Sequence, residues 1–314
     1  MDWRLKALLQ LAFSMIPQGE ELNYFVQRYV VRSLPVSNVS IAASVSYAKR
    51  HIDTFQRHSH RALGQATFYE FGAGWDMAIP LALYGFGVET QTLVDIRRLI
   101  RVALIHDTIE KYQGIASELA IPRRPAAYLN CNKYNFTTLL KQQYGIDYRA
   151  PCDAKQTGLS SRSIDCITST STLEHIPPED IGSILRECYR IMRDDGLMSV
   201  LIDYDDHYSY FDSTISPYNY LQYSDRMWSL FSPALHYQNR LRHRDYLELF
   251  QSAGFHVVED QHKDATEMDL KELEQLSIDA RFQNYSLRDL AVHSAFLVIR
   301  KRPAGNPKTN VSDT

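Results

Sequence analysis

The stretch Thr67–Asp76, TFYEFGAGWD, decides the fold that the sequence predicts. A run of strand-forming residues ends in an acid and passes into two glycines, Gly72 and Gly74, and the apolar helical pattern Met77–Tyr84 follows. A strand, a glycine turn and a helix in this order are typical of the start of a nucleotide-binding α/β unit, because glycine lets the backbone approach a ligand that a Cβ atom would block. Ordinary turns also contain Gly-x-Gly, so the interpretation depends on what lies downstream.

Strand and helix patterns alternate from about Ala66 onward. The predicted strands are Thr67–Phe71, Thr90–Ile96, Ile146–Cys152, Ser163–Thr170, Leu197–Tyr204, Phe255–Glu259 and Ser294–Arg300. This alternation predicts an α/β fold with a doubly wound, mostly parallel seven-stranded sheet and helices on both faces. Right-handed crossovers then bring the carboxyl ends of the strands, and any ligand, to one edge of the sheet.

Three other regions surround or interrupt the alternating pattern. Residues 1–60 show helical periodicity without strand alternation, which predicts a helical N-terminal cap over the ligand edge. Within the main domain, residues 61–302, the aromatic and polar stretch 207–242 follows the fifth strand. Long loops in compact domains are commonly functional, so we expect a lid insertion there. Residues 303–314 are polar and rich in Pro, Gly and Asn, which predicts a flexible tail.

The composition favours a soluble, cytoplasmic protein. No apolar run reaches the roughly 18–20 residues that span a bilayer, so no membrane partner is expected. The formal net charge of −3 gives no basic surface for nucleic acid. The four cysteines have neither metal-ligand spacing nor the pattern of a disulfide framework. The apolar face of the first predicted helix leaves room for a homodimer.

Acidic residues stand at the ends of the first three predicted strands. Glu70 precedes the glycine turn, and Asp95 ends the second strand, 23 residues after Gly72 (95 − 72). An acid in this place can accept hydrogen bonds from both hydroxyl groups of a ribose. Asp153, in PCDA, is placed to accept a hydrogen bond from an adenine amino group.

In these features the chain resembles class I S-adenosylmethionine-dependent methyltransferases, over roughly Ala66–Arg302. Glu70, Gly72 and Gly74 match the acid-x-Gly-x-Gly motif of the family, and Asp95 and Asp153 match its ribose-binding and adenine-contacting acids. The run SIDCITSTSTLEHI is similar to its fourth motif. The resemblance implies a Rossmann-like domain over residues 61–302 that binds S-adenosylmethionine. The implied cofactor-binding residues are Glu70, Gly72, Ala73, Gly74, Asp76, Asp95, Ile96, Asp153, Ala154, Ser169 and Thr170.

One residue of the glycine turn departs from the family pattern. Asp76 stands where the family often has a third glycine. Two interpretations are open: either the loop is tighter, or Asp76 itself contacts the methionine ammonium group. In either case Trp75 and Asp76 are expected to crowd the methionine end of the cofactor.

Candidates for a catalytic base lie after the fourth and fifth strands. A sulfonium methyl group is already activated, so the enzyme chiefly aligns the reactants and excludes water. A base is needed only if the accepting atom carries a proton. The candidates are His175 in LEHIP, His207 in DYDDHY and Tyr204 beside it, and His236 is a weaker one. For each residue, ordinary packing or a solvated loop position is the alternative.

Three other kinds of site are disfavoured. GAGWDM lacks the last glycine of a dinucleotide motif and has an acid where pyrophosphate would lie. The chain has no G-x-S-x-G turn, which argues against a serine hydrolase. A metal site of Asp203, Asp205, Asp206 and His207 is disfavoured because neighbouring residues of a strand point to opposite faces, so no metal is predicted.

A net acidic chain with an aromatic lid suits a small organic acceptor better than a macromolecule or a lipid. The resemblance implies methyl transfer to O, N or C of that acceptor, as in specialised metabolism. One alternative keeps the cofactor but cyclises it, releasing methylthioadenosine and forming azetidine-2-carboxylate. The others are a non-catalytic binding protein with this fold and a methyltransferase of protein or nucleic acid. The mass of the product separates methyl transfer from cyclisation.

Overall fold

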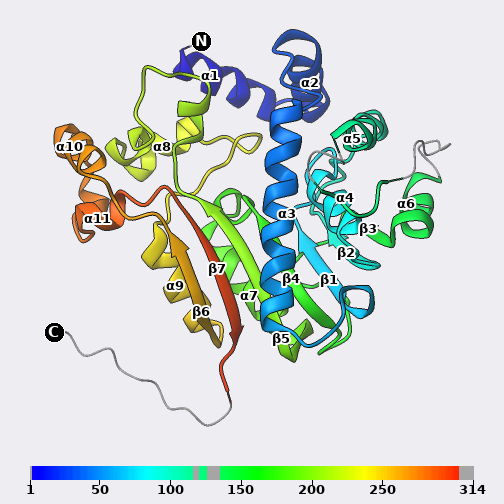
Figure 1. Cartoon of the computed structure of the whole chain (residues 1–314). Coiled ribbons are helices and arrows are strands. Elements are labelled where there is room, and N and C mark those ends of the chain that lie inside the picture. Colours follow the sequence, from blue (N-terminus) through cyan, green and yellow to red (C-terminus); the bar gives the residue numbers. More distant parts are fainter. Residues whose placement is uncertain (1, 116–119, 126–134, 304–314) are drawn as a thin grey trace.

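A seven-stranded sheet forms the centre of the molecule (Figure 1). The computed structural model describes residues 2–115, 120–125 and 135–303. The strands lie in the order β3-β2-β1-β4-β5-β7-β6, and β7 runs antiparallel to both of its neighbours. In chain order the strands are β1 Thr67–Phe71, β2 Thr90–Val94, β3 Ile146–Arg149, β4 Ile164–Thr170, β5 Met192–Asp203, β6 Phe255–His262 and β7 Ser294–Lys301.

Helices cover both faces of the sheet, which confirms the predicted doubly wound α/β fold (Figure 1). One face carries α3 (Asn38–His58), α4 (Ala78–Gly85), α5 (Val102–Ile115) and α6 (Phe136–Tyr144), and the other carries α7 (Pro178–Ile191) and α9 (His243–Ser252). Side chains of β1 alternate between the two cores. Phe68 contacts Phe55 of α3 with ring centroids 5.1 Å apart, whereas Tyr69 and Phe71 belong to the core beneath α7.

The direction of β7 is a feature that the sequence did not predict. β7 is the last strand in the chain, yet it lies between β5 and β6 and pairs antiparallel with each. The apolar pattern of a buried strand carries no information on its direction, because both faces are covered in either orientation. β5 also begins earlier than predicted, at Met192, where it already pairs with Ile164.

The first 60 residues lie in two different places. α1 (Trp3–Ser14), α2 (Gly19–Phe25) and a π-helical turn (Val26–Val30) lie near the carboxyl edge of the parallel strands, whereas α3 crosses the face of the sheet (Figure 1). The imidazole of His51, in α3, is fully buried and lies 2.7 Å from the Ser199 hydroxyl of β5. The division of the chain at residue 60 stays a prediction.

The predicted lid, 207–242, contributes to a third core that is separate from the two beneath the helices. It contains two 3-10 turns, His207–Tyr210 and Asn219–Gln222, and α8 (Asp225–Phe231). Trp3 of α1 packs among lid side chains, with its ring centroid 5.3 Å from that of Tyr208 and 4.8 Å from that of Phe231. α10 (Glu267–Gln275) and α11 (Leu287–Leu290) complete this core, which we call the lid core.

Two further predictions concern the ends of the chain and membranes. The predicted flexible tail, 303–314, falls almost wholly on residues 304–314, which lie outside the described part of the chain. Within the described residues, no helix has the length and apolar character that crossing a membrane requires.

Candidate functional site

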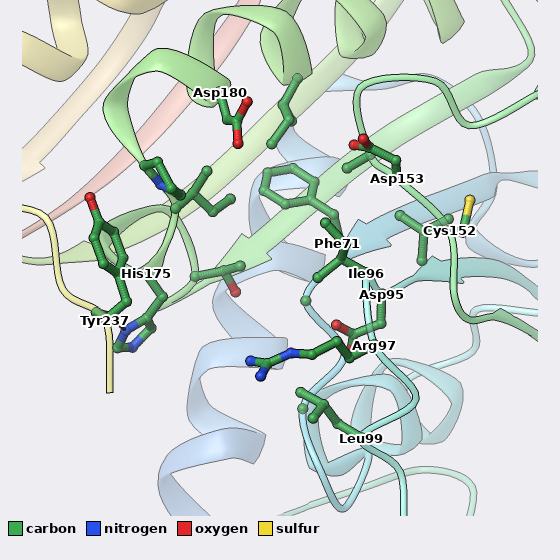
Figure 2. A pocket seen from close by; sticks show the side chains of 18 of the residues that line it. Phe71, Asp95, Ile96, Arg97, Leu99, Cys152, Asp153, His175, Asp180 and Tyr237 are labelled. Carbon is green, nitrogen blue, oxygen red and sulfur yellow. Dashed lines mark hydrogen bonds between the residues drawn. The ribbon is translucent and has the colours of Figure 1, made fainter. Parts of the chain in front are cut away.

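A cavity of about 500 Å³ opens at the edge of the sheet where the parallel strands end. Its walls come from the glycine turn after β1, from the segments after β2, β3 and β4, and from lid residues 234–237 (Figure 2). Ligand pockets typically enclose about 300–1,000 Å³, so the volume suits a small molecule. The predicted site residues that line this cavity are Gly72, Gly74, Asp95, Ile96, Asp153, Ala154 and His175.

The glycine turn passes so close to the loop after β4 that no side chain fits at its first glycine. Gly72 has a φ of +81°, and a Cβ atom added to it would lie 2.4 Å from Cγ2 of Thr172. The N–H of Gly72 donates to the carbonyl oxygen of Val94 at 3.0 Å, which holds the turn against β2. Gly74 has a φ of +71°. Both glycines therefore adopt conformations that other residues rarely take, and the turn lines the cavity with backbone.

Asp95 lines the cavity with a carboxylate, one oxygen of which lacks a partner. The residue is 7% exposed, and its Oδ2 atom has no hydrogen-bond partner. Burial raises the pKa of Asp95 to about 7, although Arg97 and the N–H groups of Ala73 and Ile96 act in the opposite direction. A buried acceptor without a donor is unfavourable, and a ribose diol would supply the missing donors. This supports the ribose-binding role, which stays a prediction.

Asp153 lies on the same side of the cavity as Asp95, in the loop after β3 (Figure 2). Its Oδ1 atom accepts the N–H of Lys155 at 2.8 Å, and its Oδ2 atom is 3.6 Å from the ammonium nitrogen of that lysine. The Lys155 ammonium group donates to Asp180 Oδ1 at 2.8 Å. The Asp153 carboxylate is therefore fixed but still half-exposed, which leaves an oxygen available to an adenine amino group.

Two predicted acids, the buried Glu70 and the partly exposed Asp76, do not line the cavity. Glu70 is 4% exposed and accepts a hydrogen bond from the Thr168 hydroxyl at 3.4 Å. Burial raises the pKa of Glu70 to about 8. The Oδ1 atom of Asp76 accepts the N–H of Ala78 at 3.1 Å at the start of α4, and burial also raises the pKa of Asp76. In this structure the Asp76 side chain thus accepts a hydrogen bond from the first N–H group of α4. Its contact with a methionine ammonium group stays a prediction.

Ser169 and Thr170, at the end of β4, also lie outside the cavity lining, whereas the next two residues, Ser171 and Thr172, belong to it. The Ser169 hydroxyl is buried without a hydrogen-bond partner, whereas Thr170 Oγ1 lies 3.1 Å from Nε2 of His51. Burial lowers the pKa of His51 to about 3, so this ring is neutral. Thr170 and Ser199 thus connect α3 to the two central strands rather than facing the predicted cofactor.

Two of the candidate bases line the cavity, His175 and the weaker candidate His236. The Nδ1 atom of His175 lies 2.7 Å from the carbonyl oxygen of Tyr237 (Figure 2). Because a carbonyl only accepts, Nδ1 carries the proton and Nε2 keeps its lone pair. The side chain of His175 is exposed to solvent at the cavity. Its pKa is nevertheless lowered to about 4, first by desolvation among the surrounding protein atoms and then, in the same direction, by the nearby His207. The ring is therefore neutral at pH 7.

The two remaining candidate bases, His207 and Tyr204, are not among the residues that line the cavity. The His207 ring centroid is 4.9 Å from that of His175, and His207 Nε2 lies 3.4 Å from Asp203 Oδ2. Tyr204 is 1% exposed, and its hydroxyl lies 3.1 Å from Nδ1 of His243. The structure therefore brings His207 next to the cavity residue His175 but keeps Tyr204 away from the ligand space.

The sequence did not reveal that α2 contacts the glycine turn. Tyr24 of α2 stacks on Trp75, with ring centroids 5.6 Å apart and planes at 10°. Arg101 lies over both rings and pairs with Glu21 at 2.6 Å. Trp75 itself lines the cavity. Tyr24 and Trp75 are about 50 residues apart in the chain, and helical periodicity does not indicate a contact between residues so far apart.

Comparisons with known proteins give one family match and several similar structures. A family model described as a methyltransferase domain matches residues 46–260, and no curated protein matches the chain. One similar structure is the 1,6-didemethyltoxoflavin-N1-methyltransferase of Burkholderia thailandensis with bound 1,6-didemethyltoxoflavin and S-adenosylhomocysteine. It has 12% sequence identity and a TM-score of 0.46, and the match covers 90% of this chain and 87% of that chain. Another is the geranyl diphosphate C-methyltransferase of Streptomyces coelicolor in complex with Mg²⁺, geranyl diphosphate and S-adenosylhomocysteine, at 12% identity, TM-score 0.43, and coverage of 82% and 80%.

Proposed function

Because the chain belongs to the methyltransferase domain family, we propose that it transfers a methyl group from S-adenosylmethionine to O, N or C of a small organic acceptor. The family match spans residues 46–260 and confirms the predicted relation to class I methyltransferases, with S-adenosylmethionine as cofactor. The observation that carries the proposal is the unpartnered, buried Oδ2 atom of Asp95 in the wall of the cavity.

The cavity has two chemically different ends (Figure 2). Asp95 and Asp153 lie at one end, beside the segments after β2 and β3, and this end suits the adenosine portion of the cofactor. His175 and Tyr237 lie at the other end. We infer that the methyl group points toward this second end, where the acceptor binds beneath the lid.

The acceptor end can activate a nucleophile that carries a proton. Nε2 of His175 presents a lone pair, because Nδ1 donates to the Tyr237 carbonyl oxygen. The sulfonium methyl group needs alignment more than activation, so the aromatic and imidazole groups chiefly position the acceptor and exclude water. The role of a base for His175 or His207 stays a prediction.

Other parts of the proposal rest on the sequence and on the molecular surface. Apolar side chains of α1 and α2 are exposed, among them Leu8 at 55% and Phe25 at 52%, which supports a homodimer. The net charge of −3 supports a small acceptor rather than nucleic acid. Specialised metabolism and a cytoplasmic location belong to the same proposal.

Product analysis tests the reaction directly. Incubation of the protein with S-adenosylmethionine and a panel of hydroxylated, amine and carbon-acid acceptors is expected to yield S-adenosylhomocysteine and an acceptor 14 mass units heavier, since CH₂ is the net addition. A parallel incubation without acceptor is expected to yield little product. If that control instead releases methylthioadenosine together with a cyclic amino acid, the protein cyclises the cofactor and does not transfer its methyl group.

Replacing His175 by Gln is expected to lower turnover about a hundredfold, at the low end of what a positioned proton acceptor contributes. The affinity for S-adenosylmethionine should stay within about twofold, because Asp95 and Asp153 lie at the other end of the cavity. Steady-state rates and calorimetry measure the two effects separately. A variant that turns over at the wild-type rate would remove His175 from the reaction.

A further inference from the structure

A cluster of three side chains lies at the acceptor end of the cavity and extends from its wall into the protein interior. Glu174 and His175 belong to the 3-10 turn after β4, Leu173–His175, and His207 begins the 3-10 turn after β5. One ligand atom from each residue lies within 4.8 Å of the other two. We call this group the Glu174 cluster.

The Glu174 cluster lacks a partner that its buried polar atoms require. Glu174 is 2% exposed, and neither carboxylate oxygen has a hydrogen-bond partner. His207 is 8% exposed, and its Nε2 atom makes no hydrogen bond of good geometry, although it lies 3.4 Å from Oδ2 of Asp203. A buried carboxylate without a partner is rare in folded proteins, so Glu174, with two imidazole rings beside it, points to a missing group that accepts electron pairs.

Groups outside the cluster contact its two imidazole rings. His175 donates its Nδ1 proton to the Tyr237 carbonyl oxygen and so keeps Nε2 free. Histidines that bind metals usually make such a bond from the other ring nitrogen. Asp203 lies 3.4 Å from Nε2 of His207, and Asp203 is itself fixed by the Tyr210 hydroxyl at 2.6 Å. The His175 ring is thus held in place before any ligand arrives, and the Asp203 carboxylate lies beside the His207 ring.

We propose that Glu174, His175 and His207 bind one divalent transition-metal ion at the acceptor end of the cavity. Two imidazoles and one carboxylate are a ligand set for Zn²⁺, Fe²⁺ or Co²⁺, and they leave coordination positions open. Ligand atoms about 2.0–2.2 Å from one ion lie roughly 3–4 Å from each other, which is close to the present separations of no more than 4.8 Å.

This site could not be predicted from the sequence, because its residues lie in the turns that follow two different strands. The aspartates near His207 have other partners: Asp205 pairs with His293 at 2.6 Å, and Asp206 accepts from Asn219 at 2.8 Å. The pairing of β4 with β5 brings Glu174 and His175 to His207 instead.

The role of the ion rests on the proposed function. An acceptor hydroxyl bound to an open coordination position loses its proton to water more readily, because the ion lowers its pKa. The resulting oxyanion forms a bond to the methyl carbon, and the electrons of the breaking C–S bond stay on sulfur, which leaves neutral S-adenosylhomocysteine. In this arrangement Nε2 of His175 coordinates the ion. The ion, rather than an imidazole base, activates the acceptor.

A second group, His243, Asp260 and His262, provides a matched control. Its ligand atoms also lie within 4.8 Å of one another. However, both nitrogens of His243 have partners, the Tyr204 hydroxyl at 3.1 Å and Asp260 at 2.8 Å, and His262 lies 2.8 Å from Asp260. This group has its partners already, and we expect it to bind no ion.

Titration of the chelator-treated, full-length protein with Co²⁺ tests the site by visible absorption and calorimetry. We expect one equivalent to bind, and Glu174→Gln and His207→Gln each to weaken binding about a hundredfold or more. His262→Gln should bind Co²⁺ like the wild type. Affinity for S-adenosylmethionine, measured in the same preparations, should be unchanged and shows that each variant is folded.

Several results would overturn the metal site. One is a wild-type protein that binds S-adenosylmethionine but no Co²⁺. Another is a Glu174→Gln variant that binds Co²⁺ as tightly as the wild type, or binding that is lost only in His262→Gln. A protein that binds Co²⁺ through Glu174 yet methylates no acceptor would instead contradict the proposed function and leave the metal site standing.

Discussion

Asp95→Ala is expected to weaken the binding of S-adenosylmethionine about a thousandfold. Hydrogen bonds to a charged group contribute about 1.5–3 kcal/mol each, and a ribose diol can donate two of them to this carboxylate. The loss of about 3–6 kcal/mol corresponds to roughly a hundredfold to ten-thousandfold, since 1.4 kcal/mol is tenfold. Calorimetry measures the effect. Asp153→Ala, which removes a half-exposed carboxylate at the same end, should cost no more than about tenfold because solvent screens it.

The pH dependence of binding provides an internal check on Asp95. Burial raises its pKa to about 7, so part of the free protein carries a protonated carboxyl at neutral pH. The ribose hydroxyls favour the ionised form, and binding below pH 7 therefore releases a proton. The dissociation constant is expected to rise by up to tenfold per pH unit below 7, and this slope should vanish in Asp95→Ala. A wild-type affinity in this variant would end the assignment.

Gly72→Ala is expected to destabilise the protein by about 2–4 kcal/mol and to abolish measurable cofactor binding. Alanine would have to adopt a φ of +81°, and its Cβ would lie 2.4 Å from Cγ2 and 2.8 Å from Oγ1 of Thr172. Relief of this contact would displace the turn that lines the cavity. Urea unfolding and calorimetry measure the two effects.

Two variants separate the contact from the backbone strain. Gly74 has a φ of +71° with no atom within 4 Å of an added Cβ, so Gly74→Ala should cost only about 1–2 kcal/mol of backbone strain. Combining Gly72→Ala with Thr172→Ala removes the two nearest atoms and leaves Thr172 Cβ at 3.2 Å, which should restore part of the stability. Equal losses in Gly72→Ala and Gly74→Ala would show that the contact with Thr172 plays no part.

The sequence predicts those parts of the molecule that are encoded locally. The glycine turn needs φ values that glycine favours, and Asp95 and Asp153 follow strands whose ends must share one edge of a parallel sheet. Contacts that depend on which elements become neighbours were not predictable in this way. The meeting of Glu174 with His207 requires that β4 and β5 be adjacent, and the stacking of Tyr24 on Trp75 requires the position of α2.

The lid core around Trp3 packs apart from the two cores that support the sheet. The cofactor end of the cavity rests on β1, β2 and β3, whereas the lid residues 234–237 form part of its acceptor wall. Substitutions in the lid core can therefore reshape one end of the cavity and leave unchanged the end where Asp95 and Asp153 lie, to which adenosine is proposed to bind. During evolution, a protein with this architecture can therefore acquire a new acceptor through substitutions in the lid core and keep the same proposed methyl donor.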